Sequence, residues 1–349
     1  MEKKKIFIII GVVLAVIALG IGGYVLLSGK GDEKESTDVT PTPAPTEEPK
    51  KSNIKIIDVD SKTRPYAVMI NCKSEALPQA GLQNAYIVYE EMVEGGITRM
   101  MALFKDKELA KVGSARSARV QYFPFVFEND AIYVHAGGSK EALERISKES
   151  INDIDVDGQY GVRDKTLKRD WEHTLFTNTT KLSQAMKDKK LRSTTETGNL
   201  LKYSADEVDL SKYETKKVNK VSIKYSNYHT SHYDYDANKK VFMRSIGSKK
   251  NVDLVTGKQY EVKNILVYGV KYSTYTYKSS TPYQRINNVG TGEGYYITNG
   301  VALPITWEKT DEKSKTVYRI KETGEELTVN DGNTYIQIYP SNGGKLTLS

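Results

Sequence analysis

The chain has 349 residues and a single cysteine, Cys72, which excludes an internal disulfide framework and a zinc site built from several cysteines. Charged residues make up 27% and hydrophobic residues 38%, so most of the chain is expected to be globular. The formal net charge of +7 favours anionic surroundings such as lipid head groups, wall polymers or nucleic acid.

The first segment, residues 1–28, is predicted to be a cytoplasmic tip followed by a transmembrane anchor. Three lysines in "MEKKK" precede the 22 residues 6–27, which carry no charge. About 20 apolar residues cross a bilayer as a helix, whereas a cleaved signal peptide usually has a shorter apolar region. The lysines should stay in the cytoplasm, which places the rest of the chain outside. Because position 30 is Lys30 and not cysteine, no lipid anchor can form there.

Residues 29–53 are predicted to be a disordered stalk. Proline, threonine and charged residues dominate the segment "GKGDEKESTDVTPTPAPTEEPKKSN". Such a composition buries too little apolar surface to offset the entropy lost on ordering. The stalk would hold the folded part clear of the membrane.

Residues 54–205 are predicted to form a mixed α/β domain. Apolar runs in 64–71, 85–104 and 131–136 predict strands, and "KEALERISKES" and "NTTKLSQAMKDKKL" predict two helices. Ser139 is expected to cap the first helix, and Thr179 or Thr180 the second. The interleaving of strands and helices indicates a mixed sheet with helical cover.

Residues 206–349 are predicted to form an all-β domain, either a sandwich or a partly open barrel. From about Val218 onward the chain has short alternating segments separated by turns rich in glycine, asparagine and aspartate. The 24 tyrosines suit half-solvated sheet faces. The fold class expected for the whole chain is therefore α+β.

Ionisable residues gather beside glycine turns in the first predicted domain. Strand ends and their loops are where mixed sheets place ligands, and the arginine fork suits phosphate or carboxylate. The candidates for ligand binding are Arg99, Arg116, Ser117, Arg119, His135, Arg169 and His173, and the candidates for general acid–base catalysis are Glu90, Glu94 and His135. In an alternative interpretation, these glutamates and arginines pair internally and lock the loops together.

No strong catalytic or cofactor motif is present. The chain has no Walker loop, no G-x-S-x-G and no H-E-x-x-H. His229 and His232 lie three apart on a predicted strand, so they should point to opposite faces and not share a metal. Nothing marks Ser114 or Ser117 as an activated nucleophile. We therefore expect no metal and no cofactor.

Several segments together resemble the YerB-like family of bacterial envelope proteins, which is catalogued as a domain of unknown function. They are "RPYAVMIN", "AYIVYEEMVEGGITRMMALF", "KVGSARSAR", "DAIYVHAGGS", "GEGYYITNGVALPITWEK" and "GNTYIQIYP". The resemblance covers nearly everything after the stalk, as two consecutive domains. The family motifs fall on Glu90, Glu94, Gly95, Gly96, Arg99, Gly113, Arg116, Ser117, Arg119, His135, Gly137, Gly138, Arg169 and His173.

The resemblance implies a place in the cell envelope, because family members are typically lipoproteins or membrane-anchored proteins of Gram-positive bacteria. It implies no reaction. This chain departs from the family pattern in three places. It lacks the lipobox cysteine, it has Asn71 and Cys72 where paired asparagines are usual, and it has "EHTLF" at 172–176 where Pro-His-Asn-Leu-Tyr is usual.

The leading hypothesis is a non-enzymatic, single-pass protein of the cell membrane that has its folded domains outside and acts by binding. Arg99, Arg116 and Arg119 would line one pocket with His135 and bind an anionic envelope polymer, a lipid phosphate or a protein of cell-wall assembly. One alternative is a hydrolase or transferase that acts on a phosphorylated or glycan envelope substrate. A second is a structural scaffold without a ligand. Nucleic acid is not an expected partner of a domain outside the cell.

Overall fold

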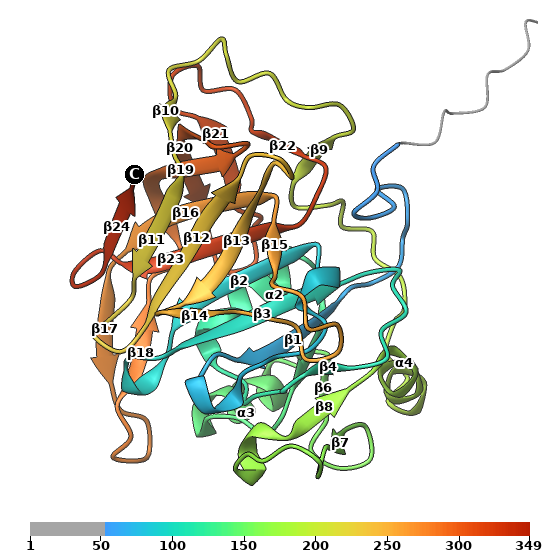
Figure 1. The fold of residues 1–349 in the computed structure, drawn as a ribbon. Helices are drawn as coiled ribbons and strands as arrows, with labels where there is room; N and C mark the ends of the chain where they lie inside the picture. The colour runs from blue at the N-terminus through green and yellow to red at the C-terminus, as the bar shows by residue number, and fades with distance from the viewer. Residues whose placement is uncertain (1–52) are drawn as a thin grey trace, which may run out of the picture. The chain divides into compact units, whose positions relative to one another are not determined.

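The structure is a computed structural model that describes residues 53–349 (Figure 1). The predicted span at 6–27 and all but the last residue of the predicted stalk lie outside these residues. Within 53–349, no helix is long and apolar enough to cross a membrane. The described part is mostly β, with few helices, so the mixed α/β character expected of the first domain is only partly found.

The main sheet has eleven strands and takes them from both halves of the chain. Its order is β10-β20-β19-β16-β23-β2-β3-β1-β5-β6, and β21 pairs with β20. The strands of the first half are β1 (Tyr66–Asn71), β2 (Ile87–Met92), β3 (Thr98–Phe104), β5 (Ile132–His135) and β6 (Asp153–Asp155). Those of the second half are β10 (Lys216–Lys217), β16 (Asn264–Val270), β19 (Gly290–Thr298), β20 (Val301–Lys309), β21 (Val317–Ile320) and β23 (Thr334–Pro340).

The two halves are joined by a parallel pairing of β2 with β23, from Ile87 opposite Thr334 to Glu91 opposite Ile338. Both strands are buried along nearly their whole length, so each needs a partner for its backbone donors and acceptors. The sequence predicted a self-contained sandwich or barrel for the second half. The shared sheet shows that this part of the prediction was wrong. The central strands of the second half continue the sheet of the first half.

A second sheet of six strands lies against the main sheet. Its order is β14-β13-β12-β11-β24, with β15 paired to β13. The strands are β11 (Lys220–Lys224), β12 (Thr230–Asp236), β13 (Val241–Ile246), β14 (Lys249–Lys250), β15 (Glu261–Val262) and β24 (Lys345–Leu348). Burial alternates along β11, which indicates one face toward the core and one toward solvent.

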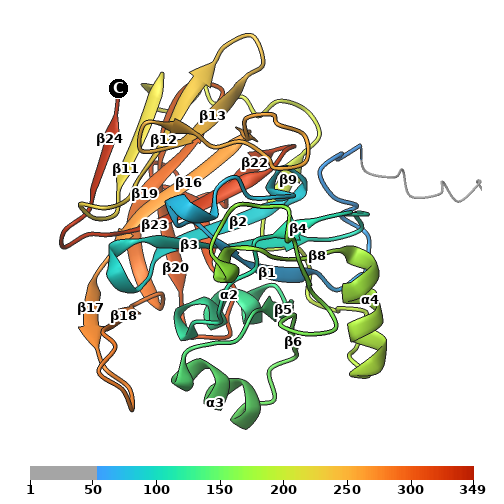
Figure 2. The same ribbon diagram turned by 60° about the horizontal axis from the view of Figure 1, so that its bottom comes forward.

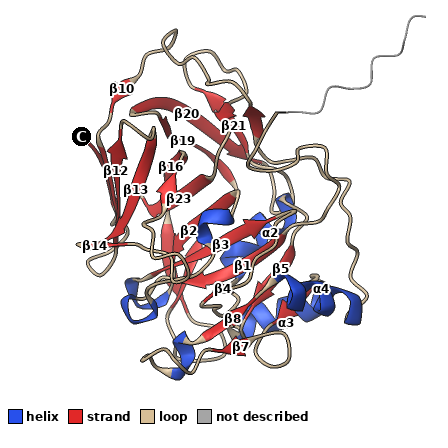
Figure 3. Cartoon of the chain, turned by 45° about the vertical axis from the view of Figure 1, so that its right-hand side comes forward, coloured by secondary structure: helices blue, strands red, loops and turns tan. Residues whose placement is uncertain are grey.

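Three small sheets complete the β structure. They pair β17 (Tyr272–Tyr275) with β18 (Tyr283–Ile286), β22 (Thr328–Asn330) with β9 (Lys202–Ser204), and β8 (Leu175–Thr177) with both β4 (Val112–Gly113) and β7 (Val162–Arg163). The helices of residues 53–349 all lie in the first half of that range and gather around its strands (Figure 3).

The α-helices are α2 (Phe123–Glu128), α3 (Lys140–Lys148) and α4 (Thr179–Asp188), and the short 3-10 helices are η1 (Ser74–Ala76), η2 (Leu82–Asn84), η3 (Glu94–Gly96), η4 (Val120–Tyr122) and η5 (Trp171–His173). Ser139 caps α3 as predicted, because its side chain accepts a hydrogen bond from the Ala142 amide. The cap of α4 is Asn178 and not a threonine, since the extended Asn178 reaches the Lys181 amide. The short α2, with a proline in its first turn, was not predicted.

The core has two parts, one on each face of the main sheet. On one face, Tyr89 of β2 packs with α2 and α3, and its ring stacks on Phe125 at a centroid distance of 4.3 Å. On the other face, the inner side of the six-stranded sheet and α4 pack on the strands (Figure 2). Many tyrosines are fully buried in these cores, among them Tyr122 and Tyr233. The sequence had instead predicted that tyrosines lie on half-solvated sheet faces.

Two fully buried ion pairs cross these layers. Glu90 of β2 accepts a hydrogen bond from Arg244 of β13 at 2.9 Å and so connects the two sheets. Glu128 of α2 lies 2.9 Å from Lys309 at the end of β20. Each carboxylate has further hydrogen-bond donors, which is the condition under which a buried charge is tolerated.

Candidate functional site

One edge of the main sheet collects most of the predicted site residues. Strands β1, β2 and β5 end there and β3 begins there. The segment from Ala115 to Arg119 lies along this edge. The Arg116 amide donates to the Met69 carbonyl at 2.9 Å, and the Arg116 carbonyl accepts from the Ala136 amide at 3.0 Å. The "SARSAR" segment is thus held between the ends of two parallel strands.

Glu94 brings two of the three arginines together. Arg119 Nε donates to Glu94 Oε2 at 2.9 Å, and Arg119 Nη2 contacts Oε1 of the same carboxylate. Arg99 Nη2 lies 3.7 Å from Glu94 Oε1, and Arg99 Nη1 donates to the Ser117 carbonyl at 2.7 Å. Burial and the nearby Arg119 lower the pKa of Arg99 to about 10. Although burial alone would raise it, the arginines bring the pKa of Glu94 down to about 2.

Arg116 faces a different carboxylate. Its Nη2 lies 2.8 Å from Glu172 Oε2, and its Nη1 donates to the Glu172 carbonyl at 3.3 Å. The Arg116 side chain is 21% exposed and that of Glu172 is 49% exposed. Arg116 is also close enough to Arg99 to lower the pKa of Arg99. The structure therefore brings all three predicted arginines to one place.

His173 approaches the same carboxylate from a buried position. The Asn71 amide donates to His173 Nδ1 at 3.0 Å, which leaves the ring proton on Nε2. That Nε2 atom lies 3.2 Å from Glu172 Oε1 but has no aligned hydrogen-bond partner. Burial lowers the pKa of His173, so the ring is a neutral donor at physiological pH. We call the set Glu94, Arg99, Arg116, Arg119, Glu172 and His173 the arginine edge.

In residues 53–349, the side chains of the remaining candidates form no hydrogen bond or ion pair with the residues of the arginine edge. His135 ends β5, but its ring nitrogens lie 2.9 Å from the Gly137 carbonyl and 3.3 Å from Asp153 Oδ2. Arg169 donates to the carbonyls of Ala76 and Pro78 and so holds the loop after β1. Ser117 contributes its backbone carbonyl to Arg99.

Glu90, which was a candidate general base, points to the opposite face of the main sheet. It is fully buried and bonded to Arg244, Thr98 and His229. Burial alone would raise its pKa, but these partners hold the pKa well below its ordinary value. His229 lies one residue before β12 and is buried beside Glu90, whereas His232 of β12 is half-buried and lies 2.8 Å from the Ser222 hydroxyl. Among residues 53–349, no group of three His, Cys, Asp or Glu side chains could hold a metal ion.

Two family models match the chain and together cover most of it. "Protein of unknown function (DUF3048) N-terminal domain" matches residues 53–192, and "Protein of unknown function (DUF3048) C-terminal domain" matches residues 221–336. The chain belongs to the DUF3048 family.

A curated protein of Bacillus subtilis (strain 168), "Putative lipoprotein YerB", is 27% identical over 283 residues, which are 80% of this chain and 82% of that protein. The crystal structure of YerB from Bacillus subtilis matches with a TM-score of 0.68 at 26% identity and covers 82% of this chain and 94% of that chain. The YerB-like family predicted from the motifs is thus confirmed.

Sequence reasoning about this DUF3048 chain missed two acidic residues beside the arginines. Glu172 lies where the chain departs from the family pattern and was not among the predicted site residues, yet it is the partner of Arg116. Glu91 is fully buried directly opposite Arg99 on β3, and neither of its carboxyl oxygens has a hydrogen-bond partner of good geometry. The signal available for Glu91 was a second glutamate in succession within an apolar strand. Burial raises its pKa well above the ordinary value.

The raised pKa of Glu91 predicts a specific pH dependence of stability. Above about pH 4.5, the unfolded chain loses this proton while the folded chain keeps it. Stability should therefore fall as pH rises, by about 1.4 kcal/mol per pH unit, until the pH passes the folded pKa. Glu91→Gln should remove this slope. Urea unfolding of both proteins at pH 5, 6 and 7 measures it, with Glu308→Gln, at an exposed position, as the control. Parallel curves for wild type and Glu91→Gln would contradict the prediction.

Proposed function

We propose that this chain is a membrane-tethered envelope protein that binds an anionic ligand at the arginine edge. The observation that carries the proposal is the convergence of two donors on one half-exposed carboxylate. Arg116 Nη2 and the buried His173 Nε2 lie 2.8 and 3.2 Å from the two oxygens of Glu172. A phosphate or carboxylate group of a ligand has the geometry to replace that carboxylate.

Because of the position of Glu172, such a replacement should cost little free energy. Its side chain is 49% exposed and is carried by the short turn η5, so it can rotate into solvent. Exposed ion pairs of this kind contribute only about 0 to 1 kcal/mol. His173 is 0% exposed and held by Asn71, so its donor stays in place when Glu172 leaves. The site is thus preorganised on the protein side.

Local charge also favours an anion. Three arginines lie at this edge, while Glu94 and Glu172 supply two negative charges and the raised pKa of Glu91 keeps it neutral. The uncharged stretch 6–27, the net charge of +7 and the relative named as a lipoprotein support a place at the membrane surface. The ligand class is a phosphate- or carboxylate-bearing envelope polymer or lipid head group.

The geometry gives less support to the enzymatic alternative. Glu94 would be a poor general base because two arginines hold its pKa at about 2. Both ring nitrogens of His135 face other groups, and the ring is buried. The scaffold alternative, by contrast, matches the pairing of Arg119 with Glu94, and the experiment below separates it from binding.

The test measures binding of inorganic pyrophosphate to the full-length chain by calorimetry. Arg116→Lys should weaken binding about tenfold, because lysine keeps the positive charge but cannot form the two parallel N–H···O hydrogen bonds of a guanidinium. Glu172→Gln should strengthen binding by up to about fivefold, because it removes the competing carboxylate. Arg145→Lys is the matched control, since Arg145 is 27% exposed and also pairs with glutamates.

Opposite effects of the two substitutions identify the arginine edge as the site. A glycerol-phosphate oligomer and vesicles of phosphatidylglycerol, tested in parallel, distinguish a polymer from a lipid source of the anion. If pyrophosphate fails to bind wild type and Glu172→Gln alike, while Arg116→Lys lowers the melting temperature, the scaffold explanation replaces this proposal.

A further inference from the structure

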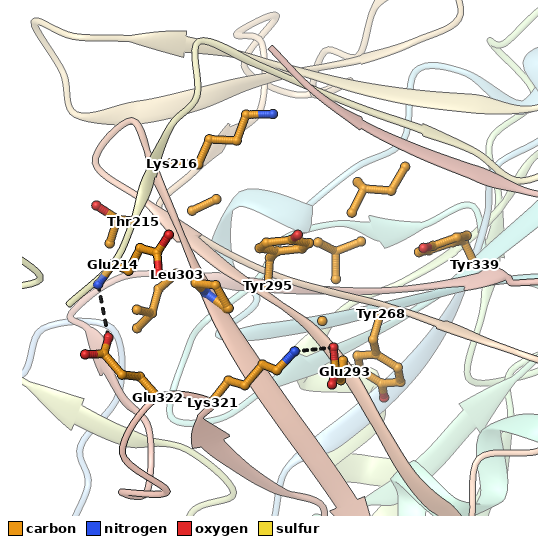
Figure 4. Close-up of a pocket in the computed structure, with 15 residues that line it drawn as sticks. Glu214, Thr215, Lys216, Tyr268, Glu293, Tyr295, Leu303, Lys321, Glu322 and Tyr339 are labelled. Atoms are coloured by element: carbon orange, nitrogen blue, oxygen red, sulfur yellow. Dashed lines mark hydrogen bonds and ion pairs between the residues drawn. The ribbon is translucent and has the colours of Figure 1, made fainter.

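A pocket of about 630 Å³ opens between the main sheet and the six-stranded sheet, and none of the residues of the arginine edge line it. We call it the intersheet groove. Its lining includes Val267 and Pro304 from the main sheet and Leu346 from β24. The half-buried rings of Tyr295 and Tyr339 line it, and the charged side chains Glu214, Lys216, Glu293, Lys321 and Glu322 surround it (Figure 4).

The groove lies beside two edge strands, each of which has one side without a hydrogen-bonded neighbour among the described strands. Within residues 53–349, β24 pairs only with β11, and β10 pairs only with β20. Ser349 and Lys220 exchange hydrogen bonds in both directions, at 3.0 and 2.7 Å. Antiparallel ladders alternate, so the backbone groups of Leu346 and Leu348 point away from β11. The Leu348 carbonyl does so, since it accepts a hydrogen bond from Lys216 Nζ at 2.9 Å.

The charges around the groove are unevenly matched. Lys321 pairs with Glu293 at 2.6 Å, and Lys216 is bonded to a backbone carbonyl. In the described part of the chain, no cation lies within ion-pair distance of the carboxylates of Glu214 or Glu322. The Glu322 carboxylate accepts only from the Glu214 amide, at 3.1 Å. A ligand that carries a positive charge would complement this end of the groove.

We propose that the intersheet groove binds an extended peptide segment of a partner protein, which adds as a strand to the free edge of β24. The Leu346 amide and carbonyl would bond to the peptide backbone. An apolar or aromatic side chain would lie between Tyr295 and Tyr339, and a lysine or arginine nearby would face Glu214 and Glu322. This inference does not depend on the arginine edge.

Strand addition fits the groove better than binding of a sugar or a small apolar molecule. An extended peptide can use main-chain hydrogen bonds for affinity and alternate side-chain pockets for specificity, and the groove offers both. The edge is also protected against indiscriminate pairing. β24 spans only Lys345–Leu348, begins with a lysine, and has its last carbonyl covered by Lys216. A partner therefore needs complementary side chains as well as a free backbone.

The test uses the full-length chain and a blocked octapeptide in which valine or tyrosine alternates with threonine and lysine. Binding is measured by fluorescence anisotropy. Tyr295→Ala should weaken binding about tenfold, since a buried aromatic contact typically dominates such interfaces. Glu214→Gln with Glu322→Gln should weaken it severalfold and reduce its salt dependence. Tyr228→Ala, at the 83% exposed Tyr228 on another loop, is the control.

Two further probes decide whether the backbone is recognised. A peptide N-methylated at alternate residues keeps its side chains but loses the donors for β24, so it should bind at least about tenfold more weakly. Equal affinity of the methylated and unmethylated peptides would overturn the proposal. Binding of chitotriose that depends on Tyr295, without any peptide binding, would show a sugar site and overturn it too. The same holds if the chain dimerises through this groove and excludes every peptide.

Discussion

Replacing Arg244 by methionine should lower the free energy of unfolding by about 3 to 5 kcal/mol, because it leaves a buried carboxylate without its counter-charge. Arg244 and Glu90 are both 0% exposed, and Arg244 Nη2 lies 2.9 Å from Glu90 Oε2. The guanidinium also contacts Asn251 Oδ1 and donates to the Tyr233 hydroxyl at 3.2 Å. Arg244 thus supplies the positive charge in a polar cluster between the two sheets, to which His229 and Ser231 also contribute.

The loss should come from the stranded charge more than from the missing contacts. Glu90→Gln combined with Arg244→Met should therefore be less destabilised than Arg244→Met alone, since the double variant buries no unpaired ion. Urea unfolding of Arg244→Met, of Glu90→Gln and of the double variant measures these differences in stability. Lys278→Met, which removes the cation from the pair with Glu144 at 54% and 40% exposure, should leave the stability nearly unchanged, because solvent screens an exposed pair. A double variant that is as unstable as the sum of its two single variants would contradict the interpretation.

Replacing Glu94 by glutamine should cost about 3 kcal/mol of stability at neutral pH. The shift of the Glu94 pKa from 4.5 to about 2 corresponds to a stabilisation of this size, and the side chain is only 24% exposed. Glutamine keeps the shape and can still accept a hydrogen bond, but it no longer compensates Arg99 and Arg119. These two arginines would then repel each other at the edge of the sheet.

The pH dependence gives this prediction a distinct signature. A carboxyl group with a lowered folded pKa stabilises the protein above its unfolded pKa, and that contribution disappears as pH falls toward the folded pKa. The stability difference between wild type and Glu94→Gln should thus be constant above about pH 5 and shrink between pH 4.5 and 2. Glu149→Gln, at a more exposed pair on α3, should show a smaller difference. A difference that does not change with pH would mean that shape, and not charge, decides the effect.

The glycine-flanked strand ends allowed the arginine edge to be anticipated in part. Arg99, Arg116 and Arg119 were expected together, and the structure places them at one edge because β1 and β5 run parallel and the "SARSAR" segment bonds to the ends of both. Which carboxylate meets which arginine was not predictable. Glu90 and Glu94 are four positions apart on a strand and the following turn, and the pleat and turn send them to opposite faces of the sheet.

The family, the cap of α3 and the strand-rich character of the second half could be predicted from the sequence, because these depend on residues that are neighbours along the chain. The sheet shared by the two halves, the pairing of Glu90 with Arg244 and the groove beside β24 became visible only in the folded chain. The residues that pair between β2 and β23 are 247 positions apart, as Ile87 and Thr334 show. Alternating apolar residues show that a strand needs partners, but the local pattern does not identify them, because backbone hydrogen bonds are the same for every partner.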